Sequence, residues 1–382
     1  MRICLFGSKL RVITFANQLV QKDIEVHLIP NRKVSDGIFS KIDSRVVCHE
    51  QLINCLKFDN KINLFLYPFT LYRLKKIINE INPDIVHCFS TVIYGWFITL
   101  INFHPFVVTT MGGDINSEQG AMKNFIRRIL TPYAIRTADA VTVQSEQGYR
   151  AVNNIDNTKE KIIFRAGFSK QLFHYDIKPE YLLERYSISN EFILLSIRGM
   201  NKPIYNIETI VNGFRIFKKI NEKTKLIILG NRHREYGEKI VSMVNRHNLE
   251  GDVIFPGVIK QSEISDYINL SDVVLSFPYN DGSPASIMES FACAKPVIAG
   301  YNKSIEEIIV NGINGFIVDT YDYKELSKKL LRLHSDKNLY ERISKNNLQE
   351  AKVHRVGNYT TKMLDVYCKL LKNNSNKEIF SK

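Results

Sequence analysis

Short apolar runs alternate along this chain with longer stretches whose apolar side chains recur at helical spacing. In the first half, the apolar runs predict strands at residues 2–6, 25–29, 85–88, 106–110, 140–143 and 162–164. Helical spacing predicts helices between them, among them residues 11–22 and 71–81. Strands that alternate with helices are typical of a parallel sheet covered by helices on both faces.

The same pattern begins again after a polar stretch at residues 171–190. It predicts strands at residues 192–197, 225–229, 253–255, 273–276, 296–299 and 315–318, and a helical tail at residues 339–371. We therefore predict an α/β protein with doubly wound domains at residues 1–185 and 186–350, and a C-terminal helix and tail at 351–382 that packs back on the first domain. Ligands are expected at the carboxyl ends of the strands, in the cleft between the domains.

The composition fits a folded protein with more than one core. A chain of 382 residues is longer than one hydrophobic core usually supports, and 45% hydrophobic with 24% charged residues is ordinary for a globular protein. The six cysteines form no C-x-x-C pair, and Cys4 and Cys88 lie in apolar runs, which argues against disulfides and zinc. The longest apolar stretch, residues 92–101, is about half of a membrane-spanning helix. We expect a cytoplasmic protein without export signal or spanning segment.

The net charge of +13 has two possible explanations: the protein binds an anionic partner, or its composition is simply rich in lysine. Nucleic acid, an anionic membrane and phosphorylated small molecules are the three candidates. The chain has no zinc-finger spacing and no other nucleic-acid motif, so we expect no nucleic-acid partner. The basic, aromatic segment at residues 67–76 is compatible with peripheral contact with an anionic membrane, and also with an ordinary amphipathic helix.

Residues 277–300 carry the most informative pattern. The strand at 273–276 runs into a loop, and Ser283 and Pro284 are a good N-cap and first residue for a helix that begins at the strand's carboxyl end. Such a helix start favours phosphate or other oxygen ligands. Asp281 precedes the helix and Glu289 lies within it, so the two acids can contact different parts of one ligand. Alternatively, Asp281 caps the helix and Glu289 pairs with a lysine.

This segment resembles the donor-site motif of retaining glycosyltransferase family 4, in which seven residues separate two acids and a Gly-x-Pro-Val sequence follows. Here Asp281 replaces the more usual Glu, Glu289 is the second acid, and residues 294–297 read Ala-Lys-Pro-Val. The similarity continues through residues 253–257, 271–275 and 306–318 and is dense over 192–333. It implies the GT-B fold with two Rossmann-like domains, in which residues 1–185 bind the acceptor and residues 186–350 bind the nucleotide sugar.

The resemblance also implies roles for the residues of the second domain. Glu289 should bind the ribose of a nucleotide and Asp281 the hydroxyls of the transferred sugar. The diphosphate should lie near the backbone amides of a short segment, which comprises Gly282, Ser283, Pro284, Ala285 and Ser286. The family places an Arg and a Lys on the diphosphate; Arg198 matches the Arg, whereas Tyr205 occupies the Lys position, so either Lys202 or Tyr205 takes that role.

The first domain offers fewer matches. Gly7 follows the first strand, where the family has a glycine loop, and is a candidate for ligand contact. His87 matches a common family histidine, although a lone histidine at a strand end is more often structural. The family's histidine beside the reacting sugar is replaced by Met111, which is followed by Gly112 and leaves Asp114 as a candidate on the acceptor side.

No D-x-D triplet occurs in the chain, so we expect no metal and no cofactor other than the nucleotide-sugar substrate. The resemblance implies retaining transfer of a hexose-type sugar from a UDP- or GDP-linked donor. A lipid-linked or oligosaccharide acceptor of bacterial O-antigen, capsule or exopolysaccharide is expected, at the inner face of the plasma membrane. Two alternatives stay open: a sugar-nucleotide epimerase of the same architecture, and a non-catalytic subunit that binds a sugar nucleotide.

Overall fold

The computed structural model describes residues 1–7, 10–30, 42–49, 67–110, 121–163, 168, 172–281, 284–354 and 356–380. The chain divides into two compact units: residues 1–167 with 356–382, and residues 168–355. The first boundary therefore falls before the polar stretch and not at 185/186. Phe168, Phe173 and Leu182 are buried among core residues of the second unit, and they draw this stretch into it.

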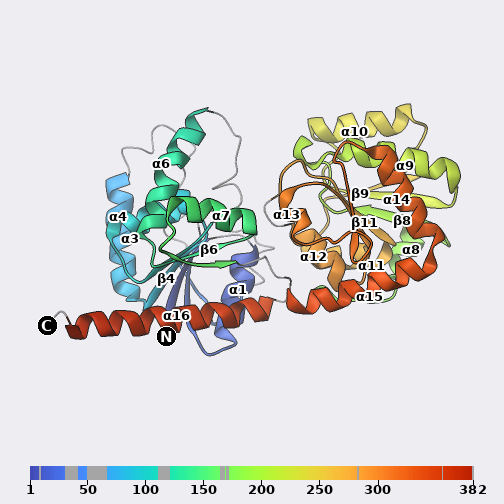
Figure 1. Ribbon diagram of the computed structural model, residues 1–382. Helices are drawn as coiled ribbons and strands as arrows, with labels where there is room; N and C mark the ends of the chain where they lie inside the picture. The colour runs from blue at the N-terminus through green and yellow to red at the C-terminus, as the bar shows by residue number, and fades with distance from the viewer. Residues whose placement is uncertain are drawn as a thin grey trace. The chain divides into compact units, whose positions relative to one another are not determined.

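The first unit is built on a parallel sheet, of which Figure 1 labels β4 and β6. Its strand order is β3-β2-β1-β4-β5-β6-β7. Its strands are β1 (Arg2–Phe6), β2 (Glu25–Ile29), β3 (Val47–Cys48), β4 (Ile85–Cys88), β5 (Phe106–Thr109), β6 (Ala140–Val143) and β7 (Glu160–Ile163). Its helices are α1 (Leu10–Val20), α3 (Tyr67–Ile81), the π-helix η3 (Thr91–Gly95), α4 (Trp96–Ile101), α6 (Ala121–Thr137), α7 (Glu146–Ile155) and α16 (Val356–Phe380).

The second unit repeats this plan with the strand order β10-β9-β8-β11-β12-β13, again all parallel. Its strands are β8 (Phe192–Ser196), β9 (Thr224–Leu229), β10 (Val253–Gly257), β11 (Val273–Ser276), β12 (Val297–Gly300) and β13 (Gly315–Val318). Its helices are α8 (Glu180–Arg185), η4 (Pro203–Tyr205), α9 (Ile207–Ile220), α10 (Glu235–Arg246), η5 (Gln261–Glu263), α11 (Ile264–Leu270), α12 (Ala285–Ala292), α13 (Lys303–Glu306), α14 (Tyr323–Ser335) and α15 (Lys337–Val353).

Each sheet is buried on both faces, because successive side chains of a strand point to opposite faces. In β8, Leu194 joins a core formed with α9, α10 and α14, while Leu195 joins a second core formed with α11 and α12. In β1, Leu5 packs towards α1 and α16, and Phe6 packs towards α3 and α4. The near-continuous apolar runs of the sequence follow from this double burial.

The chain returns to the first unit at its end. Residues 339–371 were expected as one helical tail, but α15 ends at Val353 and α16 begins at Val356. The first helix packs in the second unit, whereas Tyr359, Met363 and Tyr367 of α16 are buried in the first. Among the described residues, no helix is both long enough and apolar enough to cross a bilayer.

Candidate functional site

Two predicted site residues meet at the carboxyl edge of the second sheet. Strands β8 and β11 are neighbours, with Leu194 beside Val273, so the loops that follow them leave the same edge. Arg198 lies on the first loop and Asp281 on the second, and their side chains form an ion pair. Both are largely buried, with side-chain exposures of 24% and 13%. The sequence predicted each residue separately, and the structure adds their direct contact.

The Arg198 guanidinium is only partly satisfied by this pair. It also lies over the ring of Tyr205, with the central guanidinium carbon 5.8 Å from the ring centroid. Its Nε atom is buried and has no hydrogen-bond partner among the described residues. A buried donor without an acceptor costs about 1–3 kcal/mol, so an oxygen ligand at this position would be stabilised.

Three serines place further unsatisfied hydroxyls in the same region of the fold. Ser196 ends β8, Ser276 ends β11, and Ser286 lies in the first turn of α12. Each hydroxyl is buried without a hydrogen-bond partner in the described part of the chain. Buried polar groups are usually paired, and a group of exceptions at one sheet edge is typical of a site for an oxygen-rich ligand. Sequence reasoning named only Ser286; serines that end apolar strands were the missed signal.

Two glycines fix the course of the loop that carries Arg198. Gly199 has φ +65°, and a Cβ atom there would lie 2.1 Å from the carbonyl oxygen of Leu229. Gly230 has φ +108°, and its Cβ would lie 2.8 Å from the nitrogen of Met200. The Met200 N–H donates to the Leu229 oxygen at 3.1 Å, so the loops after β8 and β9 are in direct contact. Side chains at either glycine would push Arg198 out of place.

The helix that carries the second acid begins slightly later than predicted. Pro284 is its N-cap and Ala285 its first residue, one position later than expected, and Glu289 lies about one turn into α12. Ile287 and Met288 face the core and leave Glu289 half-buried. The predicted amide contacts at Gly282 and Ser283 lie outside the described residues.

The two candidates for the family's lysine position both lie in the loop after β8, but their surroundings differ. Lys202 immediately precedes η4 and is exposed. Tyr205 ends η4, is half-buried, and contacts the Arg198 guanidinium. Tyr205 therefore acts on Arg198 directly, whereas Lys202 extends into solvent.

The candidates of the first unit have structural partners. A Cβ atom at Gly7 would lie 2.9 Å from Val12, so this glycine allows α1 to pack closely on the strand end. His87 is buried, and its ring nitrogens bond the Tyr367 hydroxyl and the Thr109 hydroxyl, the latter at 2.7 Å. Burial lowers the pKa of His87 to about 3. His87 thus joins β4 to β5 and α16.

The other acceptor-side candidates, Met111, Gly112 and Asp114, lie outside the described residues.

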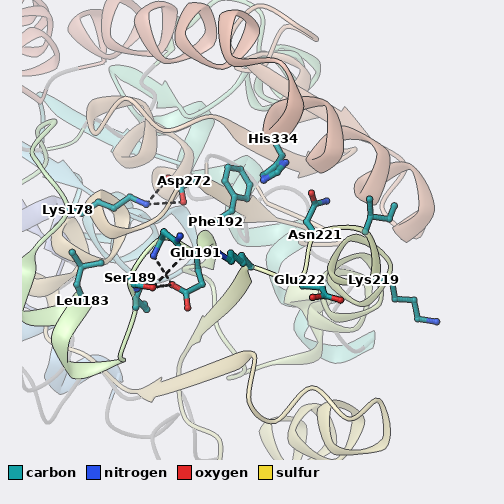
Figure 2. A pocket seen from close by; sticks show the side chains of 14 residues that line it. Lys178, Leu183, Ser189, Glu191, Phe192, Lys219, Asn221, Glu222, Asp272 and His334 are labelled. Carbon is teal, nitrogen blue, oxygen red and sulfur yellow. Dashed lines mark hydrogen bonds and ion pairs between the residues drawn. The ribbon is translucent and has the colours of Figure 1, made fainter.

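An open groove of about 770 Å³ lies elsewhere on the second unit (Figure 2). Phe192 at the start of β8 lines it, together with Lys223 before β9 and Asp272 before β11. Lys178 pairs with Asp272 there, with 2.8 Å between nitrogen and oxygen. These positions mark the amino edge of the sheet, opposite Arg198 and Asp281, and no predicted site residue lines this groove.

Comparison with known sequences identifies relatives for most of the chain. A family model described as "Glycosyl transferases group 1" matches residues 178–350, and one described as "Glycosyl transferase 4-like" matches residues 2–145. The chain is 23% identical over 344 residues to the capsular polysaccharide biosynthesis glycosyltransferase CapM of Staphylococcus aureus, covering 86% of this chain and 85% of that protein. It is 21% identical over 331 residues to the N,N'-diacetylbacillosaminyl-diphospho-undecaprenol alpha-1,3-N-acetylgalactosaminyltransferase of Campylobacter jejuni, covering 82% and 84%.

Solved structures share the fold. Sucrose-phosphate synthase from Thermosynechococcus elongatus superposes with a TM-score of 0.79 at 16% identity, covering 98% of this chain and all of that one. Anabaena HepE in complex with UDP and glucose superposes with a TM-score of 0.78 at 15% identity, covering 97% and 100%. The predicted fold, two Rossmann-like α/β units of the GT-B class, is confirmed.

Proposed function

The chain belongs to the group 1 glycosyl transferases, and from that premise we propose that it transfers a hexose-type sugar from a UDP- or GDP-linked donor. The observation that carries this proposal is the buried Arg198 guanidinium with its unpartnered Nε, at the carboxyl edge of the second sheet. A diphosphate presents several oxygen acceptors at once and suits this group. The complex of HepE with UDP and glucose supports a uridine donor.

Arg198 would act mainly on the leaving group. When the bond between the anomeric carbon and the diphosphate oxygen breaks, its electron pair stays on that oxygen. A guanidinium already held in place stabilises this charge without reorganisation, which is electrostatic catalysis. An acceptor hydroxyl then bonds the anomeric carbon from the same face and passes its proton to the departing phosphate oxygen, so the configuration is retained. No metal is needed in this scheme.

The acceptor we propose is a lipid-linked or oligosaccharide precursor of a bacterial surface polysaccharide. The names of two relatives support it, since one refers to capsular polysaccharide biosynthesis and the other to a diphospho-undecaprenol substrate. A lipid-linked acceptor lies in a membrane, and we infer peripheral contact of the first unit with the inner face of an anionic bilayer.

The charge distribution supports this contact. Residues 1–167 and 356–382 hold 26 basic and 16 acidic residues, a net charge of +10, whereas residues 168–355 hold 26 and 23, a net charge of +3. Helices α3, α4 and α6 of the first unit also expose large apolar side chains: Phe69, Tyr72, Leu100, Ile129 and Tyr133. Basic residues that attract anionic headgroups, beside apolar side chains that insert, are typical of peripheral membrane proteins.

A panel of UDP- and GDP-sugars screened by thermal shift tests the donor. The true donor should raise the melting temperature of the wild type, because it binds only the folded state. Arg198→Gln should lose this shift, while Arg342→Gln, an exposed arginine on α15, should keep it. Turnover of the donor should persist in EDTA. Absence of any shift, or turnover that EDTA abolishes and magnesium restores, would count against this function and mechanism.

A further inference from the structure

One buried asparagine connects the loops that follow three strands of the second sheet. Asn206 lies between η4 and α9, in the loop after β8, and is 1% exposed. Its Nδ2 donates to the carbonyl of Thr320, after β13, at 2.8 Å. Its Oδ1 accepts from the hydroxyl of Tyr279, after β11, at 3.1 Å and from the hydroxyl of Thr209 at 3.0 Å. A single side chain thereby fixes the spacing of three loops at the carboxyl edge.

The backbone of Asn206 also has a specific conformation. Its φ of 48° and ψ of 52° lie in the left-handed region, which few residues other than glycine and asparagine adopt. This conformation ends η4, and the Asn206 N–H donates to the Pro203 carbonyl at 2.9 Å. The chain then enters α9. Glycine is therefore the substitution that keeps this backbone while it removes every side-chain bond.

The two residues before this asparagine connect it to the proposed donor site. Tyr205 contacts the Arg198 guanidinium, whose central carbon lies 5.8 Å from the ring centroid. The Ile204 carbonyl accepts from the Tyr279 N–H at 2.9 Å, two residues before Asp281. Arg198 and Asp281 form the ion pair of the site, so the loops that hold both partners are joined next to the asparagine.

We propose that Asn206 is a positioning residue that holds the Arg198 guanidinium in place for the diphosphate; this rests on the proposed glycosyl transfer. Among the described residues, its side chain bonds neither member of the ion pair, so it acts through Tyr205 and the loop after β11. A guanidinium that is held before the ligand arrives stabilises the charge of the leaving group without reorganisation. Without this support Arg198 would still be present but would move, so that the affinity for the diphosphate and the turnover should both fall.

The arginine Nε–H resonances of the full chain, in ¹H–¹⁵N NMR spectra recorded without ligand, test the placement of Arg198. The Arg198 resonance is the one that disappears in Arg198→Gln. In the wild type it should lie apart from the exposed arginines and exchange slowly with water, because this Nε is buried. Asn206→Gly should lose this separate, slowly exchanging resonance. An unchanged Arg198 resonance in Asn206→Gly would overturn the proposal.

Asn269→Gly is the matched control. Asn269 lies in α11, before β11 at the amino edge of the same sheet, and is 3% exposed. Its Nδ2 donates to the His174 carbonyl at 3.1 Å, and its Oδ1 accepts from the Asp176 N–H at 3.2 Å. This variant should lower the stability of the second unit but keep the Arg198 resonance. Loss of the resonance in both variants would indicate general loosening of the sheet and contradict a positioning role.

Tyr279→Phe tests the same connection from the other side. It removes the hydroxyl that donates to Asn206 and keeps the ring. The Arg198 resonance should shift in the same direction as in Asn206→Gly, and this variant decides the question if Asn206→Gly does not fold. An Arg198 resonance that Tyr279→Phe leaves in place would then count against the proposal.

A double-mutant cycle with UDP or GDP, whichever binds, separates positioning from folding. Asn206→Gly should lower nucleotide affinity about fivefold to tenfold in the wild-type background. It should have no further effect in Arg198→Gln, because it acts through that guanidinium. Equal losses in the two backgrounds would show that Asn206 does not act through Arg198. If the wild type binds neither nucleotide, the proposed function fails, while the Arg198 resonance still decides whether Asn206 positions the guanidinium.

Discussion

The Arg198 and Asp281 side chains neutralise one another at the edge of the second sheet. This pairing places the guanidinium before any ligand arrives, which is the preorganisation that electrostatic catalysis requires. It also gives a diphosphate a competitor, because the Asp281 carboxylate already accepts from one nitrogen of Arg198. The two residues therefore cannot be treated as independent in mutagenesis.

We predict that Asp281→Asn reduces turnover without reducing the affinity of the protein for the bare nucleoside diphosphate. The change removes the competing charge from Arg198 but weakens a hydrogen bond to the transferred sugar, at a cost of about 1.5–3 kcal/mol in kcat/KM. Glu289→Gln, by contrast, should weaken binding of the sugar nucleotide and of the bare nucleoside diphosphate alike, because both ligands carry the ribose. Calorimetry and steady-state kinetics measure the two effects. Equal losses of nucleotide affinity in both variants would contradict these roles.

His87 should make the first unit sensitive to acid. Its folded-state pKa is lowered to about 3 by burial, while the unfolded value is close to 6.5. The unfolded state therefore binds more protons below pH 6.5, and the free energy of unfolding falls as pH is lowered.

We predict that wild type loses about 2 kcal/mol more stability than His87→Gln between pH 6.5 and pH 5, because glutamine does not titrate. Urea unfolding monitored by hydrogen exchange in β4 and β5 measures the difference. If the free energy of unfolding changed equally with pH in the two proteins, protonation of His87 would not destabilise the folded state.

At the scale of elements, α16 supplies part of the first unit's core from the far end of the chain. Its buried residues Tyr359, Met363, Tyr367 and Leu370 recur at helical spacing and pack with α1 and the first sheet. Between them, Lys362 and Lys369 are exposed. The first unit is therefore incomplete until the whole chain has been made.

We predict that Met363→Ala destabilises the first unit by about 2–4 kcal/mol, since it removes a fully buried side chain. Lys362→Ala, one residue earlier on the exposed face of α16, should change stability by less than about 0.5 kcal/mol. Hydrogen exchange resolves the two units separately, because a two-unit chain need not unfold in one step. If protection of β1 and β4 is unchanged in Met363→Ala, α16 does not support this core.

At the scale of the whole molecule, the basic charge is concentrated in the first unit. Each basic residue near an anionic surface contributes about 1 kcal/mol, and the attraction decreases as salt screens it. Arg128 and Arg136 on α6 are exposed and lie on the helix that also exposes Ile129 and Tyr133.

We predict that the protein sediments with vesicles of equal phosphatidylglycerol and phosphatidylcholine at low salt and is released as salt is raised. Replacing Arg128 and Arg136 together by Gln should weaken binding about tenfold or more, from the loss of two attractive charges. Lys324→Gln with Lys345→Gln removes the same charge from exposed positions of the second unit and should have little effect. Equal losses in both double variants would assign binding to net charge and not to α6.

The sequence by itself determined the fold class, because apolar periodicity and strand length are local properties of the chain. Strands β1, β2, β4, β6, β11 and β13 lie at their predicted residues, and the order of strands and helices follows the predicted alternation. The edge strand β3 was missed because it has only two residues. The family resemblance implied roles for Arg198 and Asp281, and both residues lie in loops at the carboxyl ends of parallel strands, where ligands bind in such folds.

Only the tertiary structure decided which of these residues meet. Arg198 and Asp281 are separated by 83 positions, and their contact depends on β8 lying next to β11. His87 became a core residue because α16 returns 280 positions later with Tyr367. The close approach of Gly199 to Leu229 follows in the same way, because β8 lies next to β9. Periodicity shows which face of an element is buried, whereas the element that covers it is set by packing across the whole chain.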